Sequence, residues 1–227
     1  MIAGMATIRG RQKMAEKAIH SVIDQVKCIC VVQNGYKDLG LYRSPKVIIH
    51  STLDGLIPDM GDANKFFGLN YMGRKDHEYI SMDDDLVYPK SYVKDFQFIA
   101  MQRLEYEVFS HHGRVMKEGA KNYYKDKEFV HRCTLSESRS RQVEFPGTGV
   151  CYINNRERWL QYNHFESANC ADVWMGIRAK QAKKRVMALS HSKGYIEYLN
   201  PKETLFDTEH IKRNNNADNA LKKYYKI

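Results

Sequence analysis

The feature that most constrains the fold is an alternation, in the first half of the chain, of short apolar segments with segments of helical periodicity. Residues 2–8, 28–32, 47–49 and 78–82 are apolar and of strand length, and the apolar positions of residues 14–23 recur at helical spacing. Strands that are apolar on both faces must be covered on both faces, and parallel strands need long crossover connections. The pattern therefore predicts an α/β fold with a Rossmann-like, mostly parallel central sheet and helices on both faces.

The second half of the chain is less regular. Its apolar positions predict helices over residues 92–104 and 172–182, a short helix near 157–162, and strands over 106–111, 150–153 and 186–189. Residues 117–142 are polar and charged and contain tyrosines, which is typical of an insertion or a mobile segment. Since no internal repeat and no clear linker interrupts the sequence, we expect a single domain over residues 1–227.

The composition is that of a basic globular protein. Of the 227 residues, 43% are hydrophobic and 28% are charged, and the formal net charge is +9. A basic surface attracts polyanions such as nucleic acid, although many solvated surfaces carry such a charge. The sequence has no run of 18 apolar residues and no secretory leader, and none of its five cysteines forms a Cys-x-x-Cys pair. We therefore expect no membrane span, reduced cysteines, and a cytoplasmic location in a bacterium or a phage-infected host cell.

Three consecutive aspartates, Asp83, Asp84 and Asp85, directly follow the apolar segment 78–82. Adjacent carboxylates repel one another, and the repulsion grows at the buried end of a strand because the local dielectric constant is low. In an extended segment side chains alternate, so Asp83 and Asp85 share one face and can share an Mg²⁺ or Mn²⁺ ion. The alternative is a solvated acidic turn that caps the helix beginning near Lys90.

Polar residues also follow the first two predicted strands. Thr7, Arg9 and Arg11 lie at the end of the first strand, and Asn34 lies at the end of the second. Ligands of parallel sheets bind beyond the carboxyl ends of the strands, where the loops converge. We therefore expect these residues and the three aspartates to meet in one crevice.

Four motifs along the chain resemble elements of the GT-A family of nucleotide-sugar glycosyltransferases. They are Gly61-Asp62-Ala63-Asn64-Lys65-Phe66, Asp83-Asp84-Asp85-Leu86-Val87-Tyr88-Pro89, Gly147-Thr148-Gly149 and Ala171-Asp172-Val173-Trp174. The second resembles the metal-binding Asp-x-Asp element of that family, and the resemblance extends to about Tyr198. It implies a GT-A type fold with a nucleotide-sugar-binding half (1–105), a small acceptor-binding half (106–200) and a basic tail (201–227).

The resemblance also implies a metal site and a catalytic base. Asp85 would bind Mn²⁺ or Mg²⁺ directly, Asp83 would contact the ribose or a metal-bound water, and Asp84 would contact the sugar. A third ligand from a C-terminal histidine would be His191, or in second place His210, although either can be an ordinary surface histidine.

The base of an inverting transfer would be Asp172, which would take the proton of the acceptor hydroxyl. The alternatives are that Asp172 only caps the helix that it begins, or that Glu166 is the base.

The resemblance also implies contacts to the donor. Arg9, Arg11 and Lys65 are candidate contacts of the phosphates or of the uracil side, Thr7 is a candidate contact of the nucleobase, and Asp62 is a candidate contact of the nucleoside. Arg9 and Arg11 can also be ordinary helix-entry residues, and Asp62 can be the cap of the helix carrying Ala63 and Phe66. Gly147, Thr148 and Gly149 would line the donor sugar and the acceptor.

Three classes of function fit these observations. The first is a metal-dependent glycosyltransferase that moves a sugar from a nucleoside-diphosphate sugar, by preference a UDP-sugar, to a glycan or to a hydroxymethylated DNA base. Phage enzymes that glycosylate 5-hydroxymethylcytosine are of the latter kind, and Arg139, Arg141 and the lysines of the tail would then contact phosphates. The second is a nucleotidyltransferase, although its glycine-rich loop is only partly present. The third is a non-catalytic module that binds nucleotides or nucleic acid.

Overall fold

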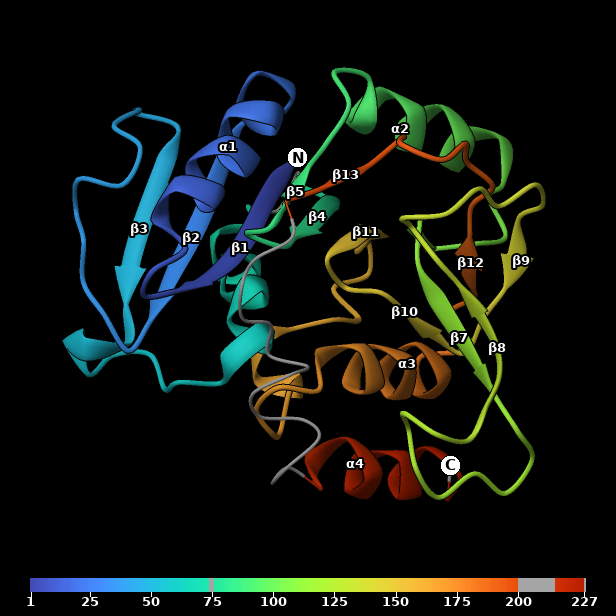
Figure 1. Cartoon of the computed structure of the whole chain (residues 1–227). Helices are drawn as coiled ribbons and strands as arrows, with labels where there is room; N and C mark the ends of the chain where they lie inside the picture. The colour runs from blue at the N-terminus through green and yellow to red at the C-terminus, as the bar shows by residue number, and fades with distance from the viewer. Residues whose placement is uncertain (74–75, 200–214, 227) are drawn as a thin grey trace.

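The computed structural model describes residues 1–73, 76–199 and 215–226. Its centre is an eight-stranded sheet with the strand order β3-β2-β1-β4-β11-β6-β12-β9 (Figure 1). The strands are β3 (Val47–Ser51), β2 (Cys28–Asn34), β1 (Ile2–Ile8), β4 (Glu78–Met82), β11 (Val150–Asn154), β6 (Val108–Ser110), β12 (Val186–Ala188) and β9 (Arg141–Gln142). The first four are mutually parallel, as are β6 and β12, whereas β11 is antiparallel to both β4 and β6. The predicted mostly parallel α/β sheet is therefore confirmed.

Helices cover both faces of this sheet. On one face lie α1 (Gln12–Val22), which continues into the 3-10 turn η1 (Ile23–Gln25), and α2 (Tyr92–Gln102). On the other lie the 3-10 helix η3 (Gly61–Tyr71), α3 (Ala171–Gln181) and α4 (Asn216–Tyr224). Successive strand residues alternate between the two apolar cores, so that Ile2 packs with η3 while Ala3 and Met5 pack with α1.

Two small sheets flank the central one. In the first, β7 (Gly113–Met116) lies between β10 (Phe145–Pro146) and β8 (Lys127–His131). In the second, β5 (Leu86–Val87), directly after the aspartates, pairs with β13 (Glu197–Tyr198). The remaining elements are the 3-10 turns η2 (Thr52–Asp54) and η4 (Tyr162–His164).

One close approach between layers depends on a glycine. A Cβ atom on Gly4 of β1 would lie 2.0 Å from the carbonyl oxygen of Lys65 in η3. The missing side chain therefore lets η3 lie directly against the sheet, which brings Lys65 to the end of β4.

Two sequence predictions need correction, and a third falls partly outside the described residues. The segment 117–142 is not merely an insertion, because it contains β8, which pairs with β7, and β9, which extends the central sheet. The short helix predicted near 157–162 is the single turn η4 at Tyr162–His164. In the basic tail, residues 201–214 lie outside the described residues, and α4 packs on α3 through Ala217, Ala220, Leu221 and Tyr224.

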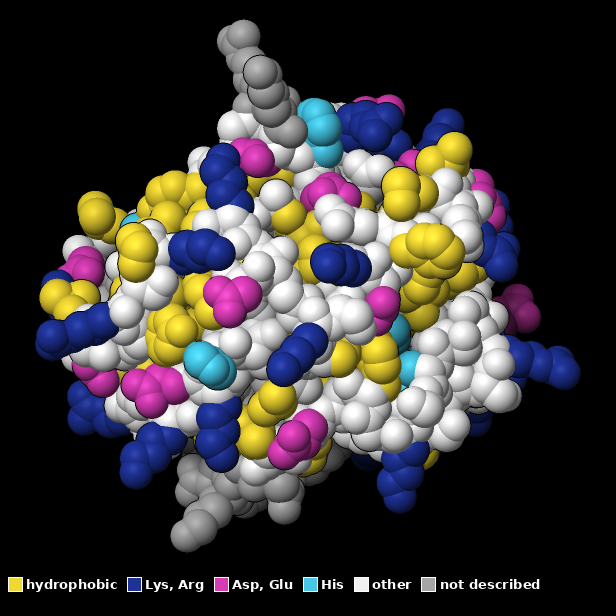
Figure 2. Space-filling view, turned by 90° about the horizontal axis from the view of Figure 1, so that it is seen from above, with side chains coloured by type: hydrophobic (Ala, Val, Ile, Leu, Met, Phe, Trp, Pro, Cys, Tyr) yellow, Lys and Arg dark blue, Asp and Glu magenta, His cyan; other side chains and the backbone are white. Residues whose placement is uncertain are grey.

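The face over α1 and α2 carries no concentrated basic patch. Figure 2 looks down on this face, and its Lys and Arg side chains are scattered among acidic and apolar ones. Within the described ranges, no helix has the length and apolar character needed to cross a bilayer.

Candidate active site

A cavity of about 770 Å³ lies where the carboxyl ends of β1, β2 and β4 meet the second half of the chain. Twelve of the residues singled out in the sequence line it: Thr7, Arg11, Asn34, Asp62, Lys65, Asp83, Asp84, Asp85, Gly147, Thr148, Gly149 and Asp172. Arg9, Glu166 and His191 are not among its lining residues, and His210 lies outside the described part of the chain. The fold thus gathers the four motifs around one hollow.

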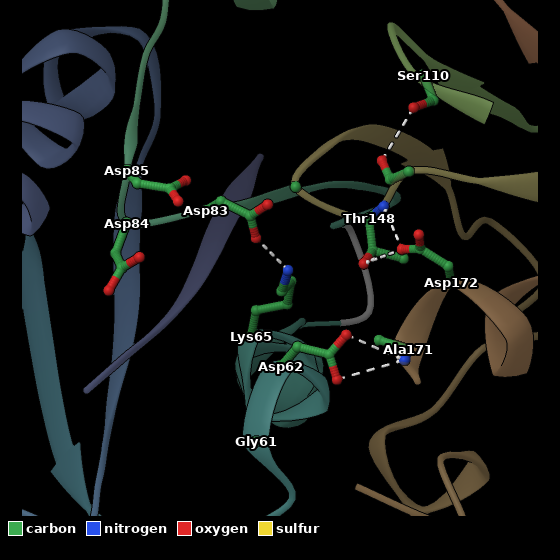
Figure 3. A network of polar contacts seen from close by, with 12 residues as sticks. Gly61, Asp62, Lys65, Asp83, Asp84, Asp85, Ser110, Thr148, Ala171 and Asp172 are labelled. Atoms are coloured by element: carbon green, nitrogen blue, oxygen red, sulfur yellow. Dashed lines mark hydrogen bonds and ion pairs between the residues drawn. The ribbon is translucent and has the colours of Figure 1, made fainter. Parts of the chain in front are cut away.

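The three aspartates divide between two cations. The Arg11 guanidinium donates from Nη1 to Asp84 Oδ1 at 2.8 Å and lies 3.5 Å from Asp85 Oδ2. The Lys65 ammonium contacts the Asp83 carboxylate. Figure 3 shows the Asp83 and Asp85 side chains pointing toward the side of Lys65 and Thr148, and that of Asp84 pointing away. This arrangement follows the alternation expected of an extended segment.

The acidic cluster has fewer positive charges than negative ones. Burial, reinforced by Asp83 and Asp84, raises the pKa of Asp85 to about 7. Burial also raises the pKa of Asp84, although Arg11 opposes the rise. Two cations facing three partly buried carboxylates leave a local excess of negative charge, which a divalent cation would compensate.

The donor set for such an ion is small. Asp83 and Asp85 both line the cavity, but the described residues contain no group of three or more His, Cys, Asp or Glu side chains arranged to hold a metal. The ring of His191 instead lies among buried histidines, with its centroid 5.3 Å from that of His111 and 5.5 Å from that of His131. Protein oxygens can therefore supply only part of a metal's coordination here, as is usual for Mg²⁺.

The amino end of α3 faces the same cavity, and two aspartates meet there. Asp62 of η3 accepts a hydrogen bond from the Ala171 amide, at 3.1 Å to Oδ2. Asp62 thus caps α3 rather than its own helix, whose cap position is Met60. Burial raises the pKa of Asp62 to about 7. Asp172 does not cap α3, because the cap position is Cys170 and makes no side-chain capping bond.

Asp172 instead bonds across the cavity to the glycine turn. Its Oδ1 accepts from the Thr148 amide at 2.9 Å and from Thr148 Oγ1 at 2.7 Å (Figure 3). Burial alone would raise the pKa of Asp172, but Arg114, Thr148 and His112 outweigh burial and hold the pKa below its usual value. The carboxylate is therefore ionised at neutral pH.

The two glycines of this turn are required by close packing. A Cβ atom on Gly149 would lie 1.8 Å from Asp83 Oδ2, and one on Gly147 would lie 2.5 Å from the His112 Cβ. Ser110 Oγ fixes the turn from β6 by donating to the Gly147 carbonyl at 2.9 Å. The turn can therefore lie against the acidic cluster only with glycine at these positions.

Sequence reasoning missed part of the cavity wall. Arg114 of β7 and the neighbouring Tyr123, Tyr124 and Cys133 line it, as does Tyr198 of β13. The Arg114 Nη1 lies 3.5 Å from Asp172 Oδ2. These residues come mostly from the segment whose irregular pattern indicated an insertion. The paired tyrosines were the one available signal there.

The comparisons with known proteins concern the fold. The structure resembles residues 1–349 of S. aureus TarS in complex with UDP-GlcNAc, with a TM-score of 0.57, 12% identity, and 91% of this chain and 61% of that one covered. For another crystal structure of the same TarS segment, the TM-score is 0.52, the identity 14% and the coverage 83% and 58%. The chain has a glycosyltransferase-like fold.

Other comparisons add little. The chain spans only about three fifths of the TarS segment that it matches. A likeness to the inositol-1-phosphate CTP transferase from T. maritima has a TM-score of 0.46 at 12% identity, over 97% of this chain and 95% of that one, and bears no weight on function. No protein-family model and no curated protein sequence matches this chain.

Proposed function

We propose that this chain is a metal-dependent glycosyltransferase that moves a sugar from a nucleoside-diphosphate sugar to an acceptor hydroxyl, with inversion. The observation that carries the proposal is the meeting of Asp83 and Asp85 with the Gly147–Gly149 turn and Asp172 in one cavity. A UDP-sugar is the preferred donor, because the similar TarS structure holds UDP-GlcNAc.

The residues fit a divalent ion in part. Asp83 and Asp85 would hold Mn²⁺ or Mg²⁺. Burial, together with repulsion from Asp83 and Asp84, raises the pKa of Asp85, and such an ion would relieve that repulsion. The bound ion would stabilise the charge that develops on the leaving diphosphate. His191 does not line the cavity and is not needed for this proposal, since phosphate and water oxygens can complete the coordination.

The side chains of the protein have separate tasks in the transfer. Lys65 and Arg11 hold the Asp83 and Asp84 carboxylates in place, so that the acidic cluster is organised before the donor binds. Asp172 takes the proton of the acceptor hydroxyl while the hydroxyl oxygen attacks the anomeric carbon and the bond to the diphosphate oxygen breaks. Its low pKa keeps it ready to accept that proton at neutral pH.

The acceptor is a glycan or a hydroxymethylated DNA base. The net charge of +9 favours a polyanionic acceptor, since basic surfaces attract phosphates over long distances. Arg139 and Arg141, which are exposed and belong to the second half of the chain, are the candidate phosphate contacts.

The test begins with thermal-shift screening of nucleotide sugars with and without Mn²⁺, followed by turnover assays. We expect one donor to stabilise the protein only when the ion is present. Asp85→Asn should abolish that shift, whereas Asp54→Asn, which removes a carboxylate paired with Lys37 outside the cavity, should keep it. Asp172→Asn should keep the shift and lower transfer by about 10²–10⁴-fold.

Other outcomes separate the remaining classes of function. Release of pyrophosphate from a nucleoside triphosphate, without sugar transfer, would favour a nucleotidyltransferase. Inertness toward every donor, with melting that does not respond to metal, would favour a binding module. Full donor response in Asp85→Asn would remove the acidic cluster from the mechanism.

A further inference from the structure

We propose that Arg114 is a positioning residue for Asp172: it keeps this carboxylate ionised and, with Thr148, fixes which of its oxygens receives the acceptor proton. The task of Asp172 in transfer comes from the proposed function, on which this inference rests. The charge state of Asp172 can nevertheless be measured without any turnover.

Arg114 reaches the cavity from a fixed backbone. It lies on β7, the middle strand of its sheet, opposite Val130 of β8 on one side and Phe145 of β10 on the other. The Arg114 carbonyl accepts a hydrogen bond from the Glu144 amide at 3.0 Å. A side chain that starts from a strand held on both edges has few ways to move away from its partner.

The guanidinium is held by aromatic faces as well as by charge. Its carbon lies 4.6 Å from the centre of the Tyr123 ring and 5.7 Å from that of Tyr124. The Arg114 side chain is only 16% exposed, and its Nη1 lies 3.5 Å from Asp172 Oδ2. A cation stacked on aromatic rings and shielded from water acts more strongly on a nearby carboxylate than an exposed cation does.

The two oxygens of Asp172 are not equivalent. Oδ1 receives both hydrogen bonds from Thr148, whereas Oδ2 faces Arg114 Nη1 at 3.5 Å and the Tyr123 hydroxyl at 3.4 Å. The contacts of Oδ2 are long, and the Asp172 side chain is 23% exposed. Oδ2 is therefore the oxygen that can accept a further proton, and Arg114 sits beside it.

The other groups around Asp172 do not replace Arg114. Burial, together with Arg114 itself, lowers the pKa of His112 to about 4, so this imidazole is neutral near pH 7. Lys65 also attracts Asp172, but its ammonium contacts Asp83, and Asp62 is a second acid whose presence disfavours charge on Asp172. The remaining titratable neighbours stay neutral, because burial raises the pKa of each: Tyr123, Tyr124, Cys133, Cys151 and Cys170. Within the described part of the chain, Arg114 is thus the permanent cation that forms an ion pair with this carboxylate.

The direction of the effect follows from these influences. Burial pushes the pKa of Asp172 up, and Arg114 is the largest influence that pushes it down. Without the guanidinium, less would oppose burial, and Asp172 would take up a proton at a higher pH. The acid side of the pH profile of transfer would then move toward neutrality.

The test compares Arg114→Met and Arg114→Lys with the wild type, and uses Arg185→Met as a control. Arg185 also stacks on a tyrosine, 4.3 Å from the centre of the Tyr106 ring, but does not line the cavity. The titration of Asp172 is followed by carbon NMR of the carboxyl groups, with its signal identified as the one lost in Asp172→Asn. We expect Arg114→Met to raise the midpoint by at least about one pH unit and to move the acid side of the pH profile of transfer upward by the same amount, Arg114→Lys to have a smaller effect, and Arg185→Met to have none.

The outcomes separate this inference from the proposed function. An unchanged Asp172 midpoint in Arg114→Met overturns the inference whatever the activity. A shifted midpoint in a protein whose wild type transfers no sugar supports the positioning role and sinks the glycosyltransferase proposal instead. If Arg114→Met does not fold, the double variant Arg114→Met/Asp172→Asn decides: regained melting shows that the unpaired carboxylate was the cause, and continued unfolding assigns Arg114 a purely structural role and overturns the inference.

Discussion

At the scale of single residues, Asp85 is the least neutralised member of the acidic cluster. Its nearest cation, Arg11 Nη1, is 3.5 Å away and bonds more closely to Asp84. Burial, reinforced by Asp83 and Asp84, raises the pKa of Asp85 in the folded protein to about 7, above the ordinary value of 3.8 that it has when unfolded. A raised carboxyl pKa means that stability is present at low pH and is lost as the pH rises from about 4 to about 7.

We predict that Asp85→Asn stabilises the metal-free protein. At pH 8 in the presence of a chelator, the free energy of unfolding of the variant should exceed that of the wild type by on the order of 1–2 kcal/mol, because the variant no longer buries a charge at this position. At pH 4.5 the two proteins should nearly coincide. Urea unfolding at both pH values measures the difference, with Asp54→Asn as the surface control. A variant less stable than the wild type at pH 8 would show that the charge of Asp85 is already balanced within the protein.

Sequence predicts the residue types of the site better than their partners. The aspartates, the glycine turn and Asp172 all belong to short local motifs, so their approach to one cavity follows from the order of the elements. At the start of α3, Asp62 caps the helix by bonding to Ala171, 109 positions away. Asp172 bonds instead to Thr148, 24 positions away. Such pairings depend on three-dimensional packing that no local pattern contains.

At the scale of elements, the turn Gly147–Gly149 is the contact between the two halves of the site. We predict that Gly149→Ala displaces the Asp83 carboxylate, since the added Cβ would lie 1.8 Å from Asp83 Oδ2. The apparent affinity for the donor, measured from the thermal shift in the presence of Mn²⁺, should fall by ~10-fold or more, because metal ligands tolerate little displacement. Gly40→Ala is the control: its Cβ would meet only Asp38 Oδ1, at 3.2 Å, outside the cavity. Equal loss in both variants would indicate general destabilisation rather than a local displacement.

Three buried histidines join the ends of β6 and β8 to the segment that follows β12. His131 Nε2 donates to the Leu189 carbonyl at 2.8 Å, and the ring of His191 touches those of His111 and His131. Burial, with the neighbouring histidines adding to it, lowers the pKa of His111 to about 3, and burial lowers that of His131 as well. A lowered histidine pKa means that stability is complete above the unfolded value of 6.5 and is lost as the pH falls toward the folded value.

We predict that His111→Phe makes stability less dependent on pH. Between pH 7 and pH 5, proton uptake by unfolded His111 alone should cost the wild type about 2 kcal/mol, which the variant should not lose. Phenylalanine suits the aromatic surroundings of Tyr92 and Phe96. Urea unfolding at the two pH values provides the measurement, and His20→Asn, at an exposed position of α1, is the control. Parallel losses in His111→Phe and the wild type would contradict the prediction.

Elements with a strong period were predictable, and those held by tertiary contacts were not. The bounds of β1 and β4 match the apolar segments 2–8 and 78–82, because these strands are buried on both faces. The strands β8 and β9 were missed, since β8 is half-exposed and β9 is two exposed residues long. Their pairing with β7 and β12 supplies the stability that their sequences do not indicate.

At the scale of the whole molecule, charge bears on the choice between a glycan and a DNA acceptor. The net charge of +9 attracts any polyanion, so DNA binding alone would not identify an acceptor. The position of the basic residues that bind DNA says more about the acceptor than the net charge does. Arg139 and Arg141 lie at the β9 edge of the central sheet, whereas Lys13 and Lys17 are on α1 near its other end (Figure 1). The two pairs are exposed, and reversing either pair changes the net charge equally.

We predict that Arg139→Glu/Arg141→Glu weakens binding to duplex DNA by ~10-fold or more and flattens its dependence on salt, because lost phosphate contacts release fewer counterions. Lys13→Glu/Lys17→Glu should weaken binding much less, since α1 lies on a face without a concentrated basic patch. Electrophoretic binding across a series of salt concentrations measures both. Equal weakening by the two double variants would mean that DNA senses only the overall charge, and the preference between the two acceptors would then pass to a glycan, whose recognition requires no phosphate contacts at the β9 edge.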